Sequence, residues 1–254
     1  MTTEDFAAAL AAARQTRTKT AHPPAADFDE AEAYRIQSAA SEAYGSPRIG
    51  YKIGATSPQA QKIIGCDAPF FGPMFEADRV TVGSKVAVDE TIMGLECEFA
   101  FQMAAPFPVA GGGRSLRDLS DAVGRCAPAF ELIGRRIAGD GFPTAIQCVA
   151  DFGLNAGFCV GSDMDGWREA DLAAISVTAS IDGVETNSGT AKNVLGNPLA
   201  ALLWLAEALE KQGRRLEPGE WVSTGTCLGV VAVRPGTSVT ARYSHGAEMG
   251  LDFA

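Results

Sequence analysis

The chain has 254 residues, of which 46% are hydrophobic and 20% are charged, so it can bury a large core as one domain or as one domain with a small appendage. Its 28 glycines and 13 prolines exclude a simple helical bundle. With 21 basic and 31 acidic residues the net charge is −10, which disfavours a nucleic-acid partner, and the absence of a long apolar run argues against a membrane span.

The cysteines and histidines limit the possible chemistry. The six cysteines form no C-x-x-C pair, which indicates buried thiols in a reducing cytoplasm rather than a disulfide framework or a zinc site. The acidic start, Met1–Asp5, lacks the basic residues of a secretory signal, so we expect a cytoplasmic protein. A histidine-rich metal site is excluded because the only histidines are His22 and His245.

Two helices are expected at the beginning of the chain. Residues 5–14 are rich in alanine, the best helix former, and His22-Pro23-Pro24 ends that segment. Asp27 is predicted to cap a second helix, with Glu30 completing a capping box. Gly45 is predicted to end the second helix.

The rest of the chain has mainly the patterns of β-strands. Short apolar or alternating segments predict strands at residues 50–56, 80–82, 85–88, 95–103, 128–133, 146–151, 157–161, 174–182 and 221–233. Short helices are expected at 59–64 and 115–125, a loop at 65–73, and a long helix from Asn197, its cap, and Pro198 through Leu209.

These strands do not alternate regularly with helices, so a doubly wound parallel sheet is disfavoured. We expect an α+β fold, namely a mixed, mainly antiparallel β-roll or sandwich with a few peripheral helices. Residues 1–45 would form an N-terminal helical cap, and residues 46–254 would form one structural unit.

The segment Leu95–Met103 carries two acidic residues on one face. Side chains alternate along a strand, so its odd-numbered residues form an apolar stripe, while Glu96 and Glu98 share the opposite face, about 6.6 Å apart along the backbone. Their carboxylates could converge on one cation, and without a cation their repulsion would raise at least one pKa. The alternative is an edge strand with a solvated acidic face.

Glu131 is a lone acidic residue in the apolar segment Pro128–Ile133. A buried carboxylate needs a partner, which a metal ion can supply, whereas at a sheet edge it would face water. Three carboxylates without a suitable histidine or paired thiolates would favour Mg²⁺ or Mn²⁺ over zinc.

Lys52 lies between Gly50 and Gly54, and these glycines permit close packing or the approach of a ligand. A lysine in this setting could bind an anionic substrate group, and near a cation its pKa would fall and permit proton transfer. The alternative is a surface lysine whose charged end reaches water.

Taken in chain order, these pieces and several others resemble the 2-keto-4-pentenoate hydratase family of the fumarylacetoacetate hydrolase superfamily. The segments that carry the resemblance are residues 33–37, 50–57, 65–72, Glu96-Cys97-Glu98, Pro128–Glu131, Ala150-Asp151, Asn193–Pro198, 201–206 and Thr224-Gly225-Thr226.

The resemblance implies the β-roll fold of the superfamily's C-terminal type and a divalent metal, Mg²⁺ or Mn²⁺. It implies that residues 46–254 form the catalytic domain, with Glu96, Glu98 and Glu131 as metal ligands, Lys52 as the catalytic residue, and Asp67, Asp151 and Asn155 as substrate-binding residues. The implied reaction adds water to a small 2-hydroxy-2,4-dienoate or 2-oxo-enoate during the breakdown of aromatic compounds. A homo-oligomer, associated in some cases with a pathway partner enzyme, is also implied.

Several positions depart from the family's pattern. Phe70 stands where many members carry an acidic residue, Gly134-Arg135 replaces an Asp-Ser pair, and Phe152–Asn155 replaces small and polar residues. Arg135 and Lys192 could meet a second substrate carboxylate or lie at the surface.

These departures leave other activities open. A 4-oxalocrotonate-type decarboxylase would use the same site. An acylpyruvate C–C hydrolase is less favoured because such enzymes usually employ a histidine. A non-catalytic subunit that binds 2-oxo acids or supports a partner enzyme is the alternative from a different class.

Overall fold

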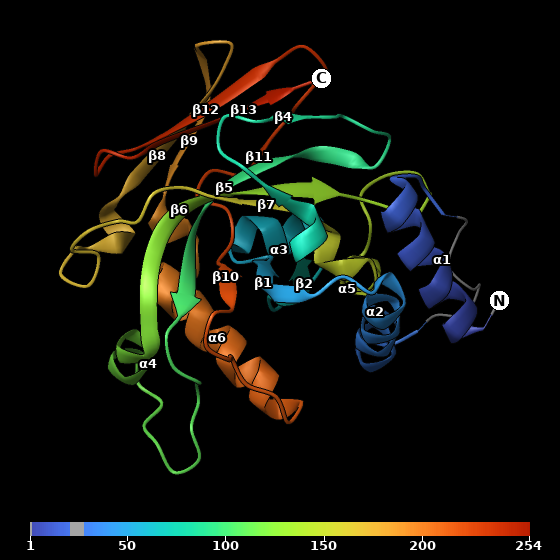
Figure 1. The fold of residues 1–254 in the computed structure, drawn as a ribbon, viewed down its shortest axis with the longest axis horizontal. Helices are drawn as coiled ribbons and strands as arrows, with labels where there is room; N and C mark the ends of the chain where they lie inside the picture. The colour runs from blue at the N-terminus through green and yellow to red at the C-terminus, as the bar shows by residue number, and fades with distance from the viewer. Residues whose placement is uncertain (1, 21–27) are drawn as a thin grey trace.

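A mixed sheet of eight strands forms the centre of the protein, seen in a computed structural model that describes residues 2–20 and 28–254 (Figure 1). Its order is β2-β1-β10-β5-β6-β7-β3, and β11 also pairs with β5. The strands are β1 (Arg48–Gly54), β2 (Phe70–Phe75), β3 (Arg79–Val80), β5 (Ile92–Met103), β6 (Val123–Gly134), β7 (Asn155–Val160), β10 (Trp221–Ser223) and β11 (Val230–Val231). The pairs β1–β10 and β3–β7 are parallel, and the other pairs are antiparallel.

A second sheet of five strands has the order β4-β13-β12-β8-β9 and lies near the C-terminus at the top of Figure 1. Its strands are β4 (Lys85–Val86), β8 (Ser176–Ile181), β9 (Val184–Thr190), β12 (Ser238–Tyr243) and β13 (Glu248–Phe253). The two sheets share one apolar core, in which Phe99 of β5 packs edge-on against Tyr243 with ring centroids 5.4 Å apart. The predicted α+β class with a mixed, mainly antiparallel β architecture is confirmed.

Helices cover the edges of this framework. They are α1 (Thr3–Thr16), α2 (Glu30–Tyr44), α3 (Pro58–Ile64), α4 (Leu116–Ala122), α5 (Ala145–Ala150) and α6 (Pro198–Lys211), with 3-10 turns η1 (Glu76–Asp78), η2 (Phe152–Leu154), η3 (Leu172–Ala174) and η4 (Ala191–Asn193). Within the described ranges, no helix is long and apolar enough to cross a membrane.

The two N-terminal helices pack on each other and lie beside α5 at the right of Figure 1. Phe6, Leu10 and Ile36 from these helices join Phe75 and Phe152 in a second apolar cluster, so the helical segment is continuous with the β framework. The division between residues 1–45 and 46–254 stays a prediction.

Helix boundaries follow local capping. Asp29 caps α2 by accepting a hydrogen bond from the amide of Glu32, whereas the predicted cap Asp27 and the break at His22–Pro24 lie outside the described residues. Asn197 caps α6 as predicted, by accepting from the amide of Leu199. Side-chain caps satisfy backbone donors that the first helical turn leaves free.

Three predicted elements were wrong. Residues 146–150 are helical in α5, and Asp151 is its C-cap. Thr144 and Gln147 form a capping box that overrides the strand preference of Ile146 and Val149. The predicted loop 65–73 includes the first part of β2, which pairs with β1 along the sheet. The predicted strand 221–233 is two short strands, β10 and β11, because residues 224–229 leave the sheet between them.

Candidate metal centre and active site

The three glutamates singled out in the sequence come together where β5 pairs with β6. The register places Glu96 directly opposite Glu131, and Glu98 opposite Ala129. One carboxylate oxygen from each of the three glutamates lies within 4.8 Å of the others. Glu98 and Glu131 are fully buried, so the alternative of a solvated acidic face is wrong for both residues.

The alternation of β5 explains why these carboxylates are buried. Its odd residues, including Cys97 and Phe99, fill the core between the two sheets. Its even face is also covered, because Ala100 belongs to a small apolar cluster with Phe158 and Trp221. Glu98 therefore lies inside the protein on a strand that is covered on both sides, while Glu96 stays partly exposed at the cavity.

Each buried carboxylate has one oxygen held by donors and one without a hydrogen bond. Glu98 Oε2 accepts hydrogen bonds from the hydroxyl of Ser223 at 2.5 Å and from the amide of Gly225 at 3.0 Å. Glu131 Oε1 accepts from Nδ2 of Asn155 at 2.9 Å. Among the described residues, Glu98 Oε1 has no hydrogen-bond partner, and Glu131 Oε2 has no partner other than the ion pair with Lys52. Buried, unpartnered carboxylate oxygens are costly unless a cation binds them, and hard divalent ions prefer oxygen ligands. The donor set therefore fits Mg²⁺ or Mn²⁺.

Lys52 is the cation that the structure places beside this cluster. Its side chain is 3% exposed, so the surface alternative is wrong, and its Nζ lies 3.3 Å from Glu131 Oε2. With all three carboxylates ionised and Lys52 protonated, the cluster carries two net negative charges, which a divalent cation would neutralise.

Burial is the main cause of the raised carboxylate pKa values in the cluster, and the neighbouring charges modify them. Burial raises the pKa of Glu131 to about 7; attraction to Lys52 opposes this shift and repulsion from Glu96 adds to it. Burial and the charges of Glu131 and Glu96 raise the pKa of Glu98 well above its usual range. Burial disfavours the charged form of Lys52, but the three carboxylates outweigh it and raise the lysine's pKa. The carboxylates alone thus keep Lys52 protonated, and the lowered pKa expected from the sequence would require the charge of a bound cation.

The glycines around Lys52 permit close packing, as predicted. A Cβ on Gly54 would lie 2.6 Å from the ring of Phe70, and this ring lies below Lys52 with its centroid 5.7 Å from Nζ. The parallel pairing of β1 with β10 places Lys52 opposite Ser223, whose hydroxyl binds Glu98. The ring of Phe70 therefore packs against both Gly54 and Lys52.

A cavity of about 740 Å³ opens beside Lys52 and Glu96. Its polar lining includes Thr56, Ser57, Asn187, Ser188, Asn193 and Thr226. Its apolar lining includes Ile63, Phe70, Phe142, Leu154, Leu228 and Val230. This volume suits a small molecule with one end at the carboxylate cluster and the other among uncharged side chains.

The other predicted substrate-binding residues have different surroundings. Asp67 lies exposed in the loop between α3 and β2. Asp151 is buried and accepts hydrogen bonds from the backbone amide of Arg136 at 2.6 Å, from its Nε at 2.5 Å and from the amide of Ile137 at 3.2 Å. Asn155 is buried against Glu131. None of the three lines the cavity, so the structure joins only Asn155 to the cluster, and their substrate-binding roles stay predictions.

The charged residues considered for a second carboxylate are also away from the cavity lining. Arg135 is buried and donates hydrogen bonds to the carbonyls of Gly139 and Gly141. Lys192 is exposed in η4.

The sequence reasoning assigned no role to Ser223 and Gly225, which hold Glu98, or to Arg14, which contacts Asn155. Gly225 belongs to the segment Thr224-Gly225-Thr226 that resembles the family, but no function was predicted for it. Arg14 lies four residues after Leu10, on the buried face of α1, and this helical spacing was the available signal.

Solved structures define the class of the protein. A 4-oxalocrotonate decarboxylase from Pseudomonas putida G7, complexed with magnesium and adipate, superposes with a TM-score of 0.89 and 26% identity, covering 99% of this chain and 97% of that chain. A putative fumarylacetoacetate hydrolase family protein from Yersinia pestis CO92 has a TM-score of 0.59 and 14% identity, over 83% of this chain and 95% of that one. The protein therefore has the fumarylacetoacetate hydrolase fold, as the resemblance implied.

Curated relatives define the family within this class. A 2-keto-4-pentenoate hydratase from Paraburkholderia phymatum is 30% identical over 256 residues, covering 99% of this chain and 97% of the relative. A 4-oxalocrotonate decarboxylase from Pseudomonas putida is 29% identical over 229 residues, covering 87% of this chain and 86% of the relative. The chain belongs to the 2-keto-4-pentenoate hydratase family, which confirms the resemblance. No protein-family model matches the chain.

Proposed function

We propose that the protein is a Mg²⁺- or Mn²⁺-dependent lyase that adds water to a small 2-hydroxy-2,4-dienoate or 2-oxo-enoate in the catabolism of aromatic compounds. The observation that carries this proposal is the cluster of three carboxylates, two of them fully buried and one ion-paired with Lys52, next to a cavity. Relatives named as hydratases, which match 83% and 99% of the chain, support the reaction.

Glu96, Glu98 and Glu131 would hold the metal ion. The magnesium in the related decarboxylase structure supports this choice of ion. When bound, a divalent ion supplies Lewis-acid stabilisation for negative charge that develops on the oxygens of a 2-oxo acid.

Lys52 would act on the substrate from the other side of the cluster. Its Nζ is buried between Glu131 and the ring of Phe70 and lines the cavity, where it can bind the substrate carboxylate or move a proton. The dienol loses its hydroxyl proton and takes up a proton on carbon to become a conjugated ketone, and water then adds across the remaining double bond. The apolar cavity residues would surround the hydrocarbon end.

The proposal is tested with purified protein and 2-hydroxypenta-2,4-dienoate. We expect loss of the dienol absorbance with Mg²⁺, no loss after treatment with a chelator, and recovery when metal is returned. A turnover rate that is unchanged by the chelator would contradict the metal-dependent mechanism. Binding of the dienoate without turnover would instead support a non-catalytic subunit that binds 2-oxo acids.

Decarboxylation of a 4-oxalocrotonate-type diacid is the second candidate. The decarboxylase structure with a TM-score of 0.89 supports it. Release of CO₂ from 2-oxohex-3-enedioate would distinguish this reaction from hydration. Hydrolysis of an acylpyruvate has less support, because His245 lies in the turn between β12 and β13 and outside the cavity lining, while His22 is not described.

The proposal also includes a homo-oligomer in the cytoplasm, with a pathway enzyme as a further partner. The family resemblance supports the assembly, and the six unpaired cysteines support a reducing compartment. Size-exclusion chromatography with light scattering measures the assembly directly, and a monomer would contradict the proposed oligomer.

A further inference from the structure

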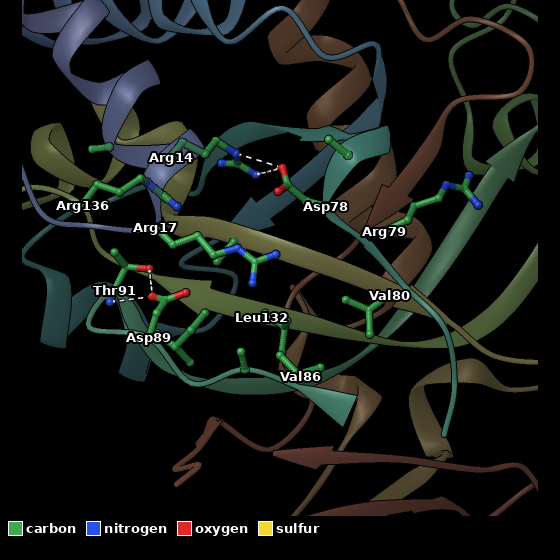
Figure 2. A pocket seen from close by; sticks show the side chains of 15 residues that line it. Arg14, Arg17, Asp78, Arg79, Val80, Val86, Asp89, Thr91, Leu132 and Arg136 are labelled. Carbon is green, nitrogen blue, oxygen red and sulfur yellow. Dashed lines mark hydrogen bonds and ion pairs between the residues drawn. The ribbon is translucent and has the colours of Figure 1, made fainter. Parts of the chain in front are cut away.

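Arg14 lies on the buried face of α1, where this helix packs against Phe75 and Phe152. It is 5% exposed, and its guanidinium lies 4.9 Å from the centroid of the Phe75 ring and 4.8 Å from that of Phe152. Its Nε and Nη2 donate to Asp78 Oδ2 at 3.0 and 2.7 Å, as Figure 2 shows. Ion pairing with Asp78 fixes the plane of the guanidinium.

The same guanidinium also donates two hydrogen bonds to Asn155. Nη1 of Arg14 donates to the backbone carbonyl of Asn155 at 2.7 Å, and Nη2 donates to its Oδ1 at 2.9 Å. Arg136 donates to the backbone carbonyl of Asn155 as well, at 2.9 Å. In the described part of the chain, Arg14 is thus the donor to the side-chain oxygen of Asn155.

This contact decides which end of the Asn155 amide faces Glu131. A guanidinium only donates hydrogen bonds and an ionised carboxylate only accepts them. With Oδ1 turned toward Arg14, Nδ2 must point away, and it donates to Glu131 Oε1 at 2.9 Å. Occupation of Oε1 leaves Oε2 of Glu131 as the oxygen without a hydrogen bond, near Lys52.

We propose that Arg14 is a positioning residue of the metal centre, which acts through Asn155 to hold Glu131 with Oε2 directed at the cation. This inference rests on the proposed function, because it takes Glu131 as a metal ligand. Residues that orient a ligating side chain commonly change metal affinity by about tenfold to a hundredfold when they are removed. The N-terminal helix would then be part of the active site although it lacks any group in the cavity lining.

The test compares two arginines on the same helix end. Arg17 lines the same small cavity of about 80 Å³ beside Arg14, but its side chain is exposed and forms no hydrogen bond or ion pair with a described residue (Figure 2). Mn²⁺ affinity is measured on metal-free protein by electron paramagnetic resonance. We expect Arg14→Met to weaken Mn²⁺ binding by about tenfold or more. Arg17→Met should stay within about twofold of the unmodified protein, since it lacks the contact to Asn155.

A double-mutant cycle separates positioning from general loss of stability. Because Arg14 acts through Asn155, Arg14→Met should cause no further loss of Mn²⁺ affinity in an Asn155→Ala background, and an additive loss would overturn the inference. If Arg14→Met does not fold, Arg14→Lys replaces it. Lysine keeps a charge near Asp78 but lacks the fork that reaches both oxygens of Asn155, so weaker Mn²⁺ binding is again expected.

The possible failures are distinguishable. If the unmodified protein does not bind Mn²⁺, the proposed metal centre is wrong and the inference falls with it. If the unmodified protein binds Mn²⁺ and Arg14→Met binds it equally well, the metal centre stands and only the role of Arg14 is wrong.

Discussion

Glu96 and Glu131 are direct cross-strand partners in the β5–β6 pair. Like charges opposite each other in a sheet destabilise it, and here the partial burial of Glu96 and the full burial of Glu131 strengthen the repulsion. Lys52 compensates for only one of the charges in the cluster. The ionised carboxylates therefore repel one another unless a cation binds or one of them takes up a proton.

Replacing Glu96 with glutamine should relieve this repulsion. We expect the melting temperature of metal-free Glu96→Gln to rise by about 1–3 °C, since a gain on the order of 1 kcal/mol corresponds to such a shift in a domain of this size. Mn²⁺ binding should weaken at the same time. Glu185→Gln, the same change at an exposed position of β9, is the control and should alter neither quantity. A Glu96→Gln protein that binds Mn²⁺ normally would remove Glu96 from the ligand set.

Stability should depend on pH in opposite ways with and without metal. The pKa of Glu131 is about 7, above its ordinary value of 4.5, so between these pH values the folded protein holds a proton that the unfolded chain has released. The free energy of unfolding of the metal-free protein therefore falls as pH rises toward 7, through this group's contribution. Metal binding requires the ionised carboxylate, so the increase in melting temperature caused by Mg²⁺ should be larger at pH 8 than at pH 6. Thermal melts with a chelator and with excess Mg²⁺ measure both trends, and equal increases at the two pH values would contradict the expectation.

Lys52→Met should separate chemistry from metal binding. We expect kcat to fall by about a hundredfold or more, because proton transfer or charge stabilisation by a positioned group contributes at least that much. Mn²⁺ affinity should be retained or increased, since a positive charge next to Glu131 is removed. Lys62→Met on the exposed side of α3 is the matched control. A Lys52→Met enzyme with near-normal kcat would refute the catalytic role.

Gly225 is required for the hydrogen bond that holds Glu98. Its φ of +108° and the 2.2 Å that would separate an added Cβ from Thr56 Oγ1 both exclude a side chain. Gly225→Ala should therefore lower the free energy of unfolding and weaken Mn²⁺ binding. Gly236→Ala controls for the backbone, because Gly236 has a φ of +86° and open space around its Cβ position, so it should cost only about 1 kcal/mol. Chemical unfolding and Mn²⁺ titration test both variants, and equal effects would show that the contact with Thr56 is unimportant.

Local patterns predicted the strand that carries Glu96 and Glu98, because alternation along Leu95–Met103 is a property of consecutive residues. They could not predict that Glu131 lies opposite Glu96, because register depends on the pairing of two strands that α4 and its loops separate. The resemblance to a known family supplied that link.

The hydrogen bonds between Arg14 and Asn155 could not be predicted from local sequence patterns either, because the two residues lie 141 positions apart in the chain. The wrong strand at residues 146–151 is a different kind of error. The sequence contains the capping box of Thr144 and Gln147, which outweighs the β preference of Ile146 and Val149.

Two neighbouring strands, β5 and β6, carry all three proposed metal ligands, whereas α3 and the segments around residues 142, 187–193 and 226–230 supply much of the cavity wall. The end of a bound molecule at the metal and the end in the outer cavity would thus contact separate parts of the chain. Substitutions in those outer segments would change the substrate specificity toward longer, shorter or differently charged acids and leave the metal ligands in place. Swapping these segments between relatives is a direct route to new specificities.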